Sequence, residues 1–280
     1  MAFNAVRPVV MEHDDAMVDA KLIDTLNPAI TGLILDMDGV LWRGTEAVVD
    51  LPAFFARASR RGLRVVLATN NATRDPGKSL DTLRSFGVEL EPWQIVTSGM
   101  AVTFQLQQRF PQGGPVYVIG EEGLVNALRE AGFFPAQENV LAVVAGLDRT
   151  LTYDKIRLAN RLIRAGAPFY GTNPDTTFPA ADEILPGAGT VLAAISTAAD
   201  VSPQIAGKPY PTIFEFSLHR LGTPRRQTLV IGDRLDTDIL GGQRAGCPTA
   251  LVLSGISTAE EALAWQPQPE IIAADLDAIV

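Results

Sequence analysis

Two aspartates, Asp36 and Asp38, follow the apolar run Leu33-Ile34-Leu35, which has the composition of a buried strand. Desolvating a carboxylate costs several kcal/mol or forces it to take up a proton, so a pair beside apolar surface is rarely kept for packing alone. Two carboxylates about 4 Å apart repel by about 4 kcal/mol at an effective dielectric constant near 20. The pair therefore indicates a metal ion or a reaction, although by itself it also fits a calcium ligand set or a turn.

The composition limits which partners this chain can have. The 280 residues are 47% hydrophobic, enough for one large domain or two smaller ones. A net charge of −9 argues against nucleic acid or an anionic membrane surface as the main partner. The single cysteine, Cys247, excludes an intrachain disulfide and every multi-cysteine metal site, and we expect it to be structural.

Targeting signals are not evident in the sequence. We find no run of roughly 18 apolar residues that could cross a membrane. Residues 1–28 lack a basic start followed by an apolar stretch, and we interpret them as an N-terminal extension, not a secretion signal. These features predict a cytoplasmic protein.

Short β-rich runs alternate with helical patterns, which is typical of a doubly wound parallel sheet in an α/β protein. Helix ends are marked clearly: Asp50 is a capping residue, and Gly62, Gly87, Gly222 and Gly246 each follow a helical pattern. Besides the first run, the predicted strands are residues 63–68, 228–231, 249–253 and 271–273. Ligands of such sheets bind beyond the carboxyl ends of the strands.

The middle of the chain repeats this alternation. The predicted strands there are residues 116–119, 141–145 and 169–171, and the predicted helices are residues 122–131, 153–165 and a segment after 186–187. We interpret residues 110–203 as an α/β cap inserted into a core domain of residues 29–109 and 204–280.

Four polar clusters fall at predicted strand ends or in loops. They are Asp36 with Asp38, Thr69-Asn70-Asn71, Gly207-Lys208-Pro209, and residues 232–238 with Asp233, Asp236 and Asp238. Taken singly, the hydroxyl of Thr69 would be a helix cap and Lys208 a solvated surface charge. The ordered set carries more information than any one member.

In this ordered set the chain resembles the haloacid dehalogenase superfamily of phosphotransferases, and within it the class IIA branch of NagD-like, nitrophenyl-phosphatase-like, phosphoglycolate and pyridoxal-phosphate phosphatases. The resemblance runs from about Thr31 to the C-terminus. It rests on six segments: residues 36–40, 68–71, 118–123, 171–175, 207–209 and 232–239. It implies a Rossmann-like core with a C2-type cap.

The resemblance implies a role for each acidic residue. Asp36 would attack phosphorus to form an aspartyl-phosphate, and Asp38 would protonate the leaving group and then activate water. The carboxylates of Asp36 and Asp233 and the main-chain carbonyl of Asp38 would bind Mg²⁺, a hard cation that prefers oxygen. Asp238, with Asp236 as a second candidate, would orient these ligands from behind.

The same resemblance implies a phosphate clamp. Lys208, the hydroxyl of Thr69 and the main-chain amides of Asn70 and Asn71 would bind the transferring phosphoryl group. In the cap, Asn173 and Asp175 would lie near the leaving group, although Thr172-Asn173-Pro174 fits a plain turn equally well. The expected partner is a small phosphorylated metabolite such as a sugar phosphate, phosphoglycolate, pyridoxal phosphate or a nucleoside monophosphate. We expect a monomer or homodimer.

Other functions compete with this prediction. Residues 72–79 fit a loosened P-loop that would use Lys78 in an NTPase or kinase, but an alanine stands at the first position and Asp75 and Pro76 would lie inside the phosphate cradle. A phospho-receiver-like switch would also need an Asp, a Thr and a Lys at a sheet end, but it would not need an inserted cap. A catalytically silent binding protein of this fold would have no use for Asp38.

Overall fold

The computed structural model describes residues 21–179 and 183–280, which form two compact units. Unit 1 contains residues 21–68, Leu80–Ile95 and Ser217–Val280. Unit 2 contains Thr69–Ser79 and Val96–Phe216. The predicted core and cap boundaries at residues 110 and 203 differ from these limits and stay a prediction.

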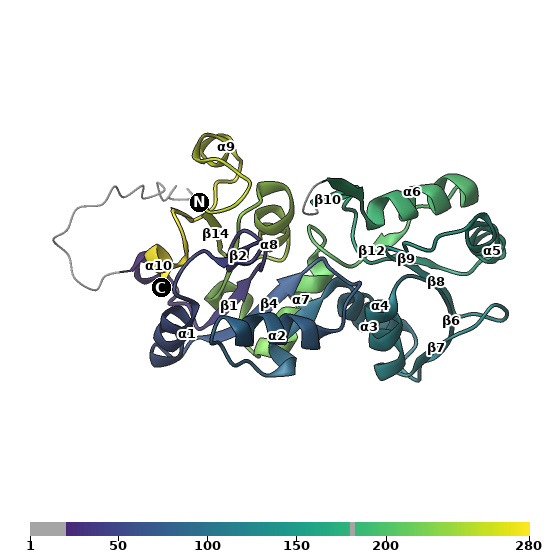
Figure 1. The fold of residues 1–280 in the computed structure, drawn as a ribbon, viewed down its shortest axis with the longest axis horizontal. Coiled ribbons are helices and arrows are strands. Elements are labelled where there is room, and N and C mark those ends of the chain that lie inside the picture. Colours follow the sequence, from purple (N-terminus) through teal and green to yellow (C-terminus); the bar gives the residue numbers. More distant parts are fainter. Residues whose placement is uncertain (1–20, 180–182) are drawn as a thin grey trace, which may run out of the picture. The chain divides into compact units, whose positions relative to one another are not determined.

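A six-stranded sheet lies mostly in unit 1 (Figure 1). Its spatial order is β15 (Ile271–Ala273), β14 (Thr249–Val252), β13 (Thr228–Gly232), β1 (Gly32–Leu35), β4 (Arg64–Thr69) and β5 (Ile95–Thr97). Strand β1 pairs in parallel with β13 and with β4, so that Leu35 lies between Ile231 and Leu67. Strands β13, β14 and β15 also pair in parallel.

Helices and loops cover both faces of this sheet. Leu33 and Leu35 of β1 pack against Phe54 of helix α1 (Leu51–Arg60) and Leu83 of helix α2 (Pro76–Ser85) in one apolar cluster. Leu251 of β14 lies in a second cluster, which also contains residues of the π-helical turn η4 (Leu235–Ile239) and of helix α9 (Ala259–Ala264). Because successive residues of a strand face opposite sides, the all-buried strands supply both clusters. The predicted doubly wound fold is confirmed.

The helix boundaries follow local chemistry. The carboxylate of Asp50 accepts a hydrogen bond from the Ala53 amide at 2.9 Å and caps α1. Gly62 follows that helix with a φ of 70°, a left-handed conformation that glycine adopts without a steric penalty. Helices α7 (Pro211–Leu221) and α8 (Leu240–Arg244) also end before the predicted glycines.

Part of the predicted N-terminal extension packs on unit 1. Residues Leu22–Thr25 form the 3₁₀ helix η1, and Ile23 is buried in the cluster that contains β1. Asp24 forms an ion pair with Arg61 at 2.6 Å. The first 20 residues of that segment lie outside the described residues.

A five-stranded sheet forms the centre of unit 2. Its order is β12 (Gln204–Ile205), β9 (Phe169–Gly171), β8 (Ala142–Ala145), β6 (Gly114–Ile119) and β7 (Phe133–Pro135), with parallel neighbours throughout. Helices α5 (Tyr153–Arg164) and α6 (Ala188–Ala199) pack on one face of it, where Ile163 and Ile195 meet the side chains of β8 and β9. The predicted strands and helices of this region are confirmed.

Unit 2 also contains elements that the sequence pattern did not show. Helix α3 (Ser98–Arg109) contacts helix α4 (Glu122–Glu130), and strands β10 (Thr177–Pro179) and β11 (Ile184–Pro186) form an antiparallel pair. In unit 1, a short hairpin of β2 (Trp42–Arg43) and β3 (Glu46–Ala47) follows the loop that carries Asp36 and Asp38.

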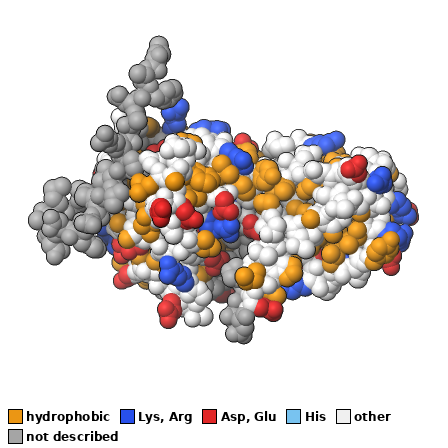
Figure 2. Space-filling model, turned by 90° about the horizontal axis from the view of Figure 1, so that it is seen from above, with side chains coloured by type: hydrophobic (Ala, Val, Ile, Leu, Met, Phe, Trp, Pro, Cys, Tyr) orange, Lys and Arg blue, Asp and Glu red, His pale blue; other side chains and the backbone are white. Residues whose placement is uncertain are grey.

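Among the residues that the structure describes, the surface shows no separate basic region on the face drawn in Figure 2. On the face shown in Figure 2, basic side chains are dispersed among acidic and apolar ones. None of the helices in the described part of the chain is long and apolar enough to span a bilayer.

Cys247 is buried, and this burial raises the pKa of its thiol to about 12, so the residue is a neutral packing group.

Candidate active site

Three aspartates of unit 1 form one acidic group. Asp36 follows β1, whereas Asp233 and Asp238 follow the neighbouring strand β13. One carboxylate oxygen from each lies within 4.8 Å of the other two. Asp233 and Asp238 are only 2% and 1% exposed. The parallel pairing of β1 with β13 brings together residues that are about two hundred positions apart, and the amide of Asp36 completes the ladder by donating to the Ile231 carbonyl at 2.9 Å.

The loop after β14 holds Asp233. Oδ2 of Asp233 accepts a hydrogen bond from the main-chain amide of Ile256 at 2.9 Å. The preceding residue, Gly255, lies so close that an added Cβ would be 1.9 Å from the same oxygen. Ser254 donates its hydroxyl to the carbonyl of Gly39 at 2.7 Å and so links this loop to the Asp36–Asp38 segment. Sequence reasoning missed the loop, although the rule that polar groups follow strand ends would have found it.

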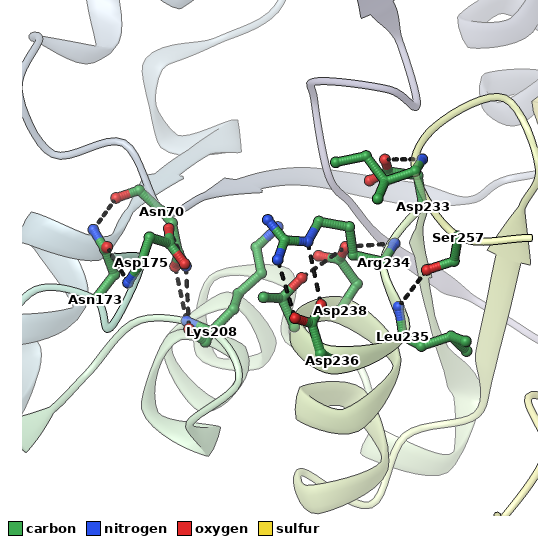
Figure 3. Close-up of polar contacts among 12 residues, drawn as sticks. Asn70, Asn173, Asp175, Lys208, Asp233, Arg234, Leu235, Asp236, Asp238 and Ser257 are labelled. Carbon is green, nitrogen blue, oxygen red and sulfur yellow. Dashed lines mark hydrogen bonds and ion pairs between the residues drawn. The ribbon is translucent and has the colours of Figure 1, made fainter. Parts of the chain in front are cut away.

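Asp238 is oriented by the turn η4. Its Oδ2 accepts hydrogen bonds from the Arg234 amide and the Thr237 hydroxyl, both at 3.3 Å. Asp236, the second candidate for this supporting role, is exposed and pairs with the Arg234 guanidinium at 3.0 Å (Figure 3). Asp238 therefore belongs to the acidic group, and the charge of Asp236 is balanced by its own neighbour on the chain.

This acidic group fits a divalent metal ion. Its three possible ligands are carboxylate oxygens, which suit hard cations such as Mg²⁺, Ca²⁺ or Mn²⁺. Three carboxylates this close repel one another strongly, and two of them are shielded from water. A bound divalent cation removes that repulsion. A cation is accordingly the physical reason for keeping these three residues together.

Asp38 is placed differently from the three aspartates. Its side chain is exposed and is not part of the acidic group. Its Oδ1 accepts a hydrogen bond from the indole Nε1–H of Trp42 at 3.0 Å. The predicted metal ligand from this residue is the main-chain carbonyl, which leaves the carboxylate available for proton transfer.

A second polar group lies in unit 2 and is centred on Asn70 (Figure 3). The Asn70 Oδ1 accepts a hydrogen bond from the Lys208 amide at 2.8 Å, and its Nδ2 donates to the Lys208 carbonyl and to Asp175 Oδ2, both at 3.1 Å. The Ser98 hydroxyl donates to the Asn70 carbonyl at 2.6 Å. Lys208 itself is only 4% exposed. The side chain of Asn70 thus holds protein groups, which leaves only its main chain for a ligand.

Asn173 and Asp175 form the turn that the sequence allowed, and their place near a leaving group stays a prediction. The Asp175 amide donates to Asn173 Oδ1 at 3.1 Å, which is an Asx turn. The Asn173 Nδ2 also donates to the Asn70 carbonyl at 2.7 Å. The segment is therefore a turn that is fastened to the Asn70 loop within unit 2.

Thr69 and Asn71 shape the same loop. Thr69 is the last residue of β4, and its Oγ1 accepts a hydrogen bond from the Asn71 amide at 3.1 Å. A hydroxyl that accepts in this way keeps its own proton for donation. The Asn71 Oδ1 accepts from the amide and the hydroxyl of Thr73, at 3.0 and 2.8 Å. The side chain of Asn71 therefore stabilises the loop.

The rival P-loop segment has a different local structure. Asp75 accepts hydrogen bonds from the amides of Gly77 and Lys78, at 2.8 Å to its carboxylate and 3.1 Å to its carbonyl. Amides that already bind an acidic residue do not form a phosphate cradle. Lys78 lies in the first turn of α2, which is an ordinary helix.

Comparisons with known proteins identify the class of this fold and site. Residues 33–134 match a family model of haloacid dehalogenase-like hydrolases, and residues 205–279 match a second, described as HAD-hydrolase-like. An acid sugar phosphatase of Staphylococcus aureus is 36% identical over 229 residues, which cover 81% of this chain and 88% of that protein.

Solved structures of phosphatases have the same fold as this chain. The double mutant of the thermostable NPPase from Geobacillus stearothermophilus superposes with a TM-score of 0.82 at 38% identity, covering 89% of this chain and 97% of that one. NagD from E. coli K-12 gives a TM-score of 0.84 at 31% identity, covering 90% and 98%.

A doubly wound sheet with aspartates after two adjacent parallel strands, together with these relatives, defines a metal-dependent α/β phosphatase. The chain belongs to the haloacid dehalogenase-like hydrolases, in their NagD-like class IIA branch. It hydrolyses phosphate monoesters of small metabolites. The P-loop and receiver alternatives have no support in these comparisons.

Proposed function

We propose that this phosphatase works through an aspartyl-phosphate on Asp36. The observation that carries the proposal is the acidic group, in which Asp36 is the only member that is not fully buried among the three described aspartates. An oxygen of Asp36 forms a bond to phosphorus while the bond from phosphorus to the leaving oxygen breaks. In the second step water attacks phosphorus, the bond to Asp36 breaks, and inorganic phosphate leaves.

Asp38 moves the protons in both steps. It gives a proton to the leaving oxygen in the first step, and it takes one from the attacking water in the second. Its exposed carboxylate, two residues after the nucleophile, supports this role. The Trp42 indole fixes one of its oxygens.

Mg²⁺ is the metal that we propose for the acidic group. Asp36 and Asp233 would bind it through carboxylates and Asp38 through its main-chain carbonyl, while Asp238 would hold the set in place. When bound, the ion neutralises the negative charge that gathers on the phosphoryl oxygens. A set of oxygen ligands that lacks histidine and cysteine supports Mg²⁺ over zinc.

Phosphate binding falls to residues of unit 2 in this proposal. The Lys208 ammonium and the Thr69 hydroxyl would contact phosphoryl oxygens, with the main-chain amide of Asn70 as a weaker candidate. The Asn71 amide already donates to Thr69 Oγ1 and is the weakest of the predicted donors. Asn173 and Asp175 would face the leaving group as part of a cap formed by residues 110–203. The bonds that join Asn70 to Lys208, Asn173 and Asp175 support a common task for these residues.

The substrate is a small phosphorylated metabolite. Sugar phosphates come first, because one relative is an acid sugar phosphatase. Phosphoglycolate, pyridoxal phosphate and nucleoside monophosphates stand beside them as candidates from the resemblance. We further propose a cytoplasmic location and a monomeric or homodimeric state.

The test measures phosphate release from p-nitrophenyl phosphate with and without Mg²⁺. Native protein should require the metal, and Asp36→Asn should lose activity by at least about a thousandfold, because the amide is not a nucleophile. Asp236→Asn is a matched control, since its carboxylate pairs with Arg234 outside the acidic group. Equal rates for native protein and Asp36→Asn would contradict the mechanism.

A further inference from the structure

We infer that Trp42 is a positioning residue for Asp38 and that it assigns different tasks to the two oxygens of this carboxylate. The inference rests on the proposed function, in which Asp38 moves protons. It adds a residue to that site and names the atom that carries the proton. All the contacts that support it lie within unit 1.

The indole of Trp42 is itself fixed. Trp42 is 7% exposed and belongs to the apolar cluster that contains β1 and α1. Its ring stacks on Phe86 with a centroid distance of 6.0 Å and an interplanar angle of 21°. A side chain buried in this way has little freedom to turn, so its Nε1–H points in a constant direction.

The main chain fixes the other partner. The Gly39 amide donates to the Trp42 carbonyl at 2.8 Å, and the Leu41 amide donates to the Met37 carbonyl at 2.8 Å. These bonds close a tight loop around Asp38, whose side chain is nevertheless exposed. An exposed aspartate normally samples several rotamers. The hydrogen bond of 3.0 Å from Trp42 Nε1 to Asp38 Oδ1 selects one of them.

The chemistry of the donor decides which oxygen carries the proton. An indole nitrogen donates a hydrogen bond and accepts none. Because Oδ1 of Asp38 already accepts this bond, we assign the acidic proton to the other oxygen, Oδ2. Oδ2 then gives the proton to the leaving oxygen and later takes one from water. Among residues 21–179 and 183–280, no other group donates to the Asp38 carboxylate, so this assignment depends on Trp42.

A simpler explanation is that Asp38 only satisfies the buried indole N–H. The two explanations differ in what Trp42→Phe does to catalysis. A phenyl ring keeps the contact with Phe86 and removes only the N–H and part of the ring. If Trp42 serves packing alone, the variant loses stability and treats every substrate alike. If Trp42 positions the acid, the variant loses most on substrates whose leaving group needs a proton.

The kinetic test compares kcat/KM across aryl and alkyl phosphates of increasing leaving-group pKa, since this ratio reports the first transfer step. Trp42→Phe should lower kcat/KM by about tenfold for alkyl phosphates and by less than about threefold for p-nitrophenyl phosphate, whose phenolate leaves with little help. Phe86→Leu, which loosens the packing but keeps the N–H, should reduce thermal stability without changing this dependence. An equal loss for all substrates in Trp42→Phe would overturn the inference.

A second measurement does not depend on activity. The chain has three tryptophans, whose indole N–H signals are separable by NMR with ¹⁵N labelling. Asp38→Ala should shift the signal that Trp42→Phe removes, and should leave that of Trp265, which donates to Gln243 Oε1, in place. An unmoved Trp42 signal would show that the contact is not made. If the native protein hydrolysed none of these esters, the proposed function would fail, and this measurement would still decide whether the contact exists.

Discussion

Asn70 and Lys208 exchange two hydrogen bonds: the Lys208 amide donates to Asn70 Oδ1 at 2.8 Å, and Asn70 Nδ2 donates to the Lys208 carbonyl at 3.1 Å. A side-chain amide carries both an acceptor and donors, so it can bind the N–H and the C=O of one residue together. The same Nδ2 also reaches Asp175 at 3.1 Å. Asn70 therefore sets the main-chain position of the lysine that we propose for phosphate binding.

Asn70→Asp should damage substrate binding more than stability. The carboxylate cannot donate to the Lys208 carbonyl, and it repels the carboxylate of Asp175, so the Lys208 loop shifts. We expect KM for p-nitrophenyl phosphate to rise by about tenfold or more, with a smaller change in Tm. Asn160→Asp is a matched control, because Asn160 only accepts a hydrogen bond from Arg164 on α5. A KM equal to that of native protein in steady-state assays would contradict this role.

Gly255→Ala should remove metal binding at the acidic group. Its Cβ would lie 1.9 Å from Asp233 Oδ2, so the carboxylate must move away from Asp36 and Asp238. We expect the rise in Tm that saturating Mg²⁺ gives the native protein to disappear; at a concentration of one hundred times Kd that stabilisation is about 2.7 kcal/mol.

Gly62→Ala provides the control for this glycine substitution. A Cβ at Gly62 meets open space, but the φ of 70° strains an alanine. This variant should lose about 1 kcal/mol of stability and keep its full response to Mg²⁺. A Gly255→Ala protein that Mg²⁺ stabilises as strongly as native protein would show that Asp233 need not be held where the structure has it.

Lys155→Met should make the stability of unit 2 depend differently on pH. Asp148 has a side chain that is 3% exposed, and its carboxylate bonds Lys155 Nζ at 2.6 Å. Burial acts to raise the pKa of Asp148, but the hydrogen bonds from Lys155 and Thr150 outweigh it, and the pKa is lowered. Because the folded pKa is depressed, the stabilisation is complete above the unfolded value near 3.9 and is lost as the pH falls through the folded pKa.

We therefore expect Lys155→Met to cost about 2 kcal/mol at pH 7, since it leaves a shielded carboxylate without its cation. This deficit should shrink as the pH falls through the lowered pKa of Asp148, where the carboxylate becomes protonated. Arg157→Met removes an exposed ion pair with Asp154 and should cost less than about 0.5 kcal/mol at either pH. Urea unfolding at several pH values checks both, and a deficit that does not change with pH would refute the assignment to Asp148.

Local signals in the sequence predict much of this structure. Asp50 and the glycines at 62, 87, 222 and 246 mark helix ends because capping and left-handed conformations are properties of single residues. Asp36 and Asp233 could be placed because both directly follow apolar runs, and parallel strands end at one edge of a sheet.

The features that the sequence does not predict depend on contacts that no residue type signals by itself. Ile256 binds Asp233 through a main-chain amide, which leaves no trace in its side chain. Nothing in the sequence marks Trp42 as a partner of Asp38, because their contact depends on the closed loop between them. Strands as short as β2 and β12, with two residues each, have no period to recognise.

The most direct test of the account is to look for the phosphoryl group on Asp36. Asp38→Asn, mixed rapidly with p-nitrophenyl phosphate and Mg²⁺ and quenched in acid, should release about one equivalent of p-nitrophenol in a burst, because this leaving group needs little protonation while the second step lacks its base. Mass spectrometry of the digested protein should then find phosphate on the peptide that contains Asp36. A quenched protein that carries no phosphate, or one that carries it on another residue, would contradict the mechanism.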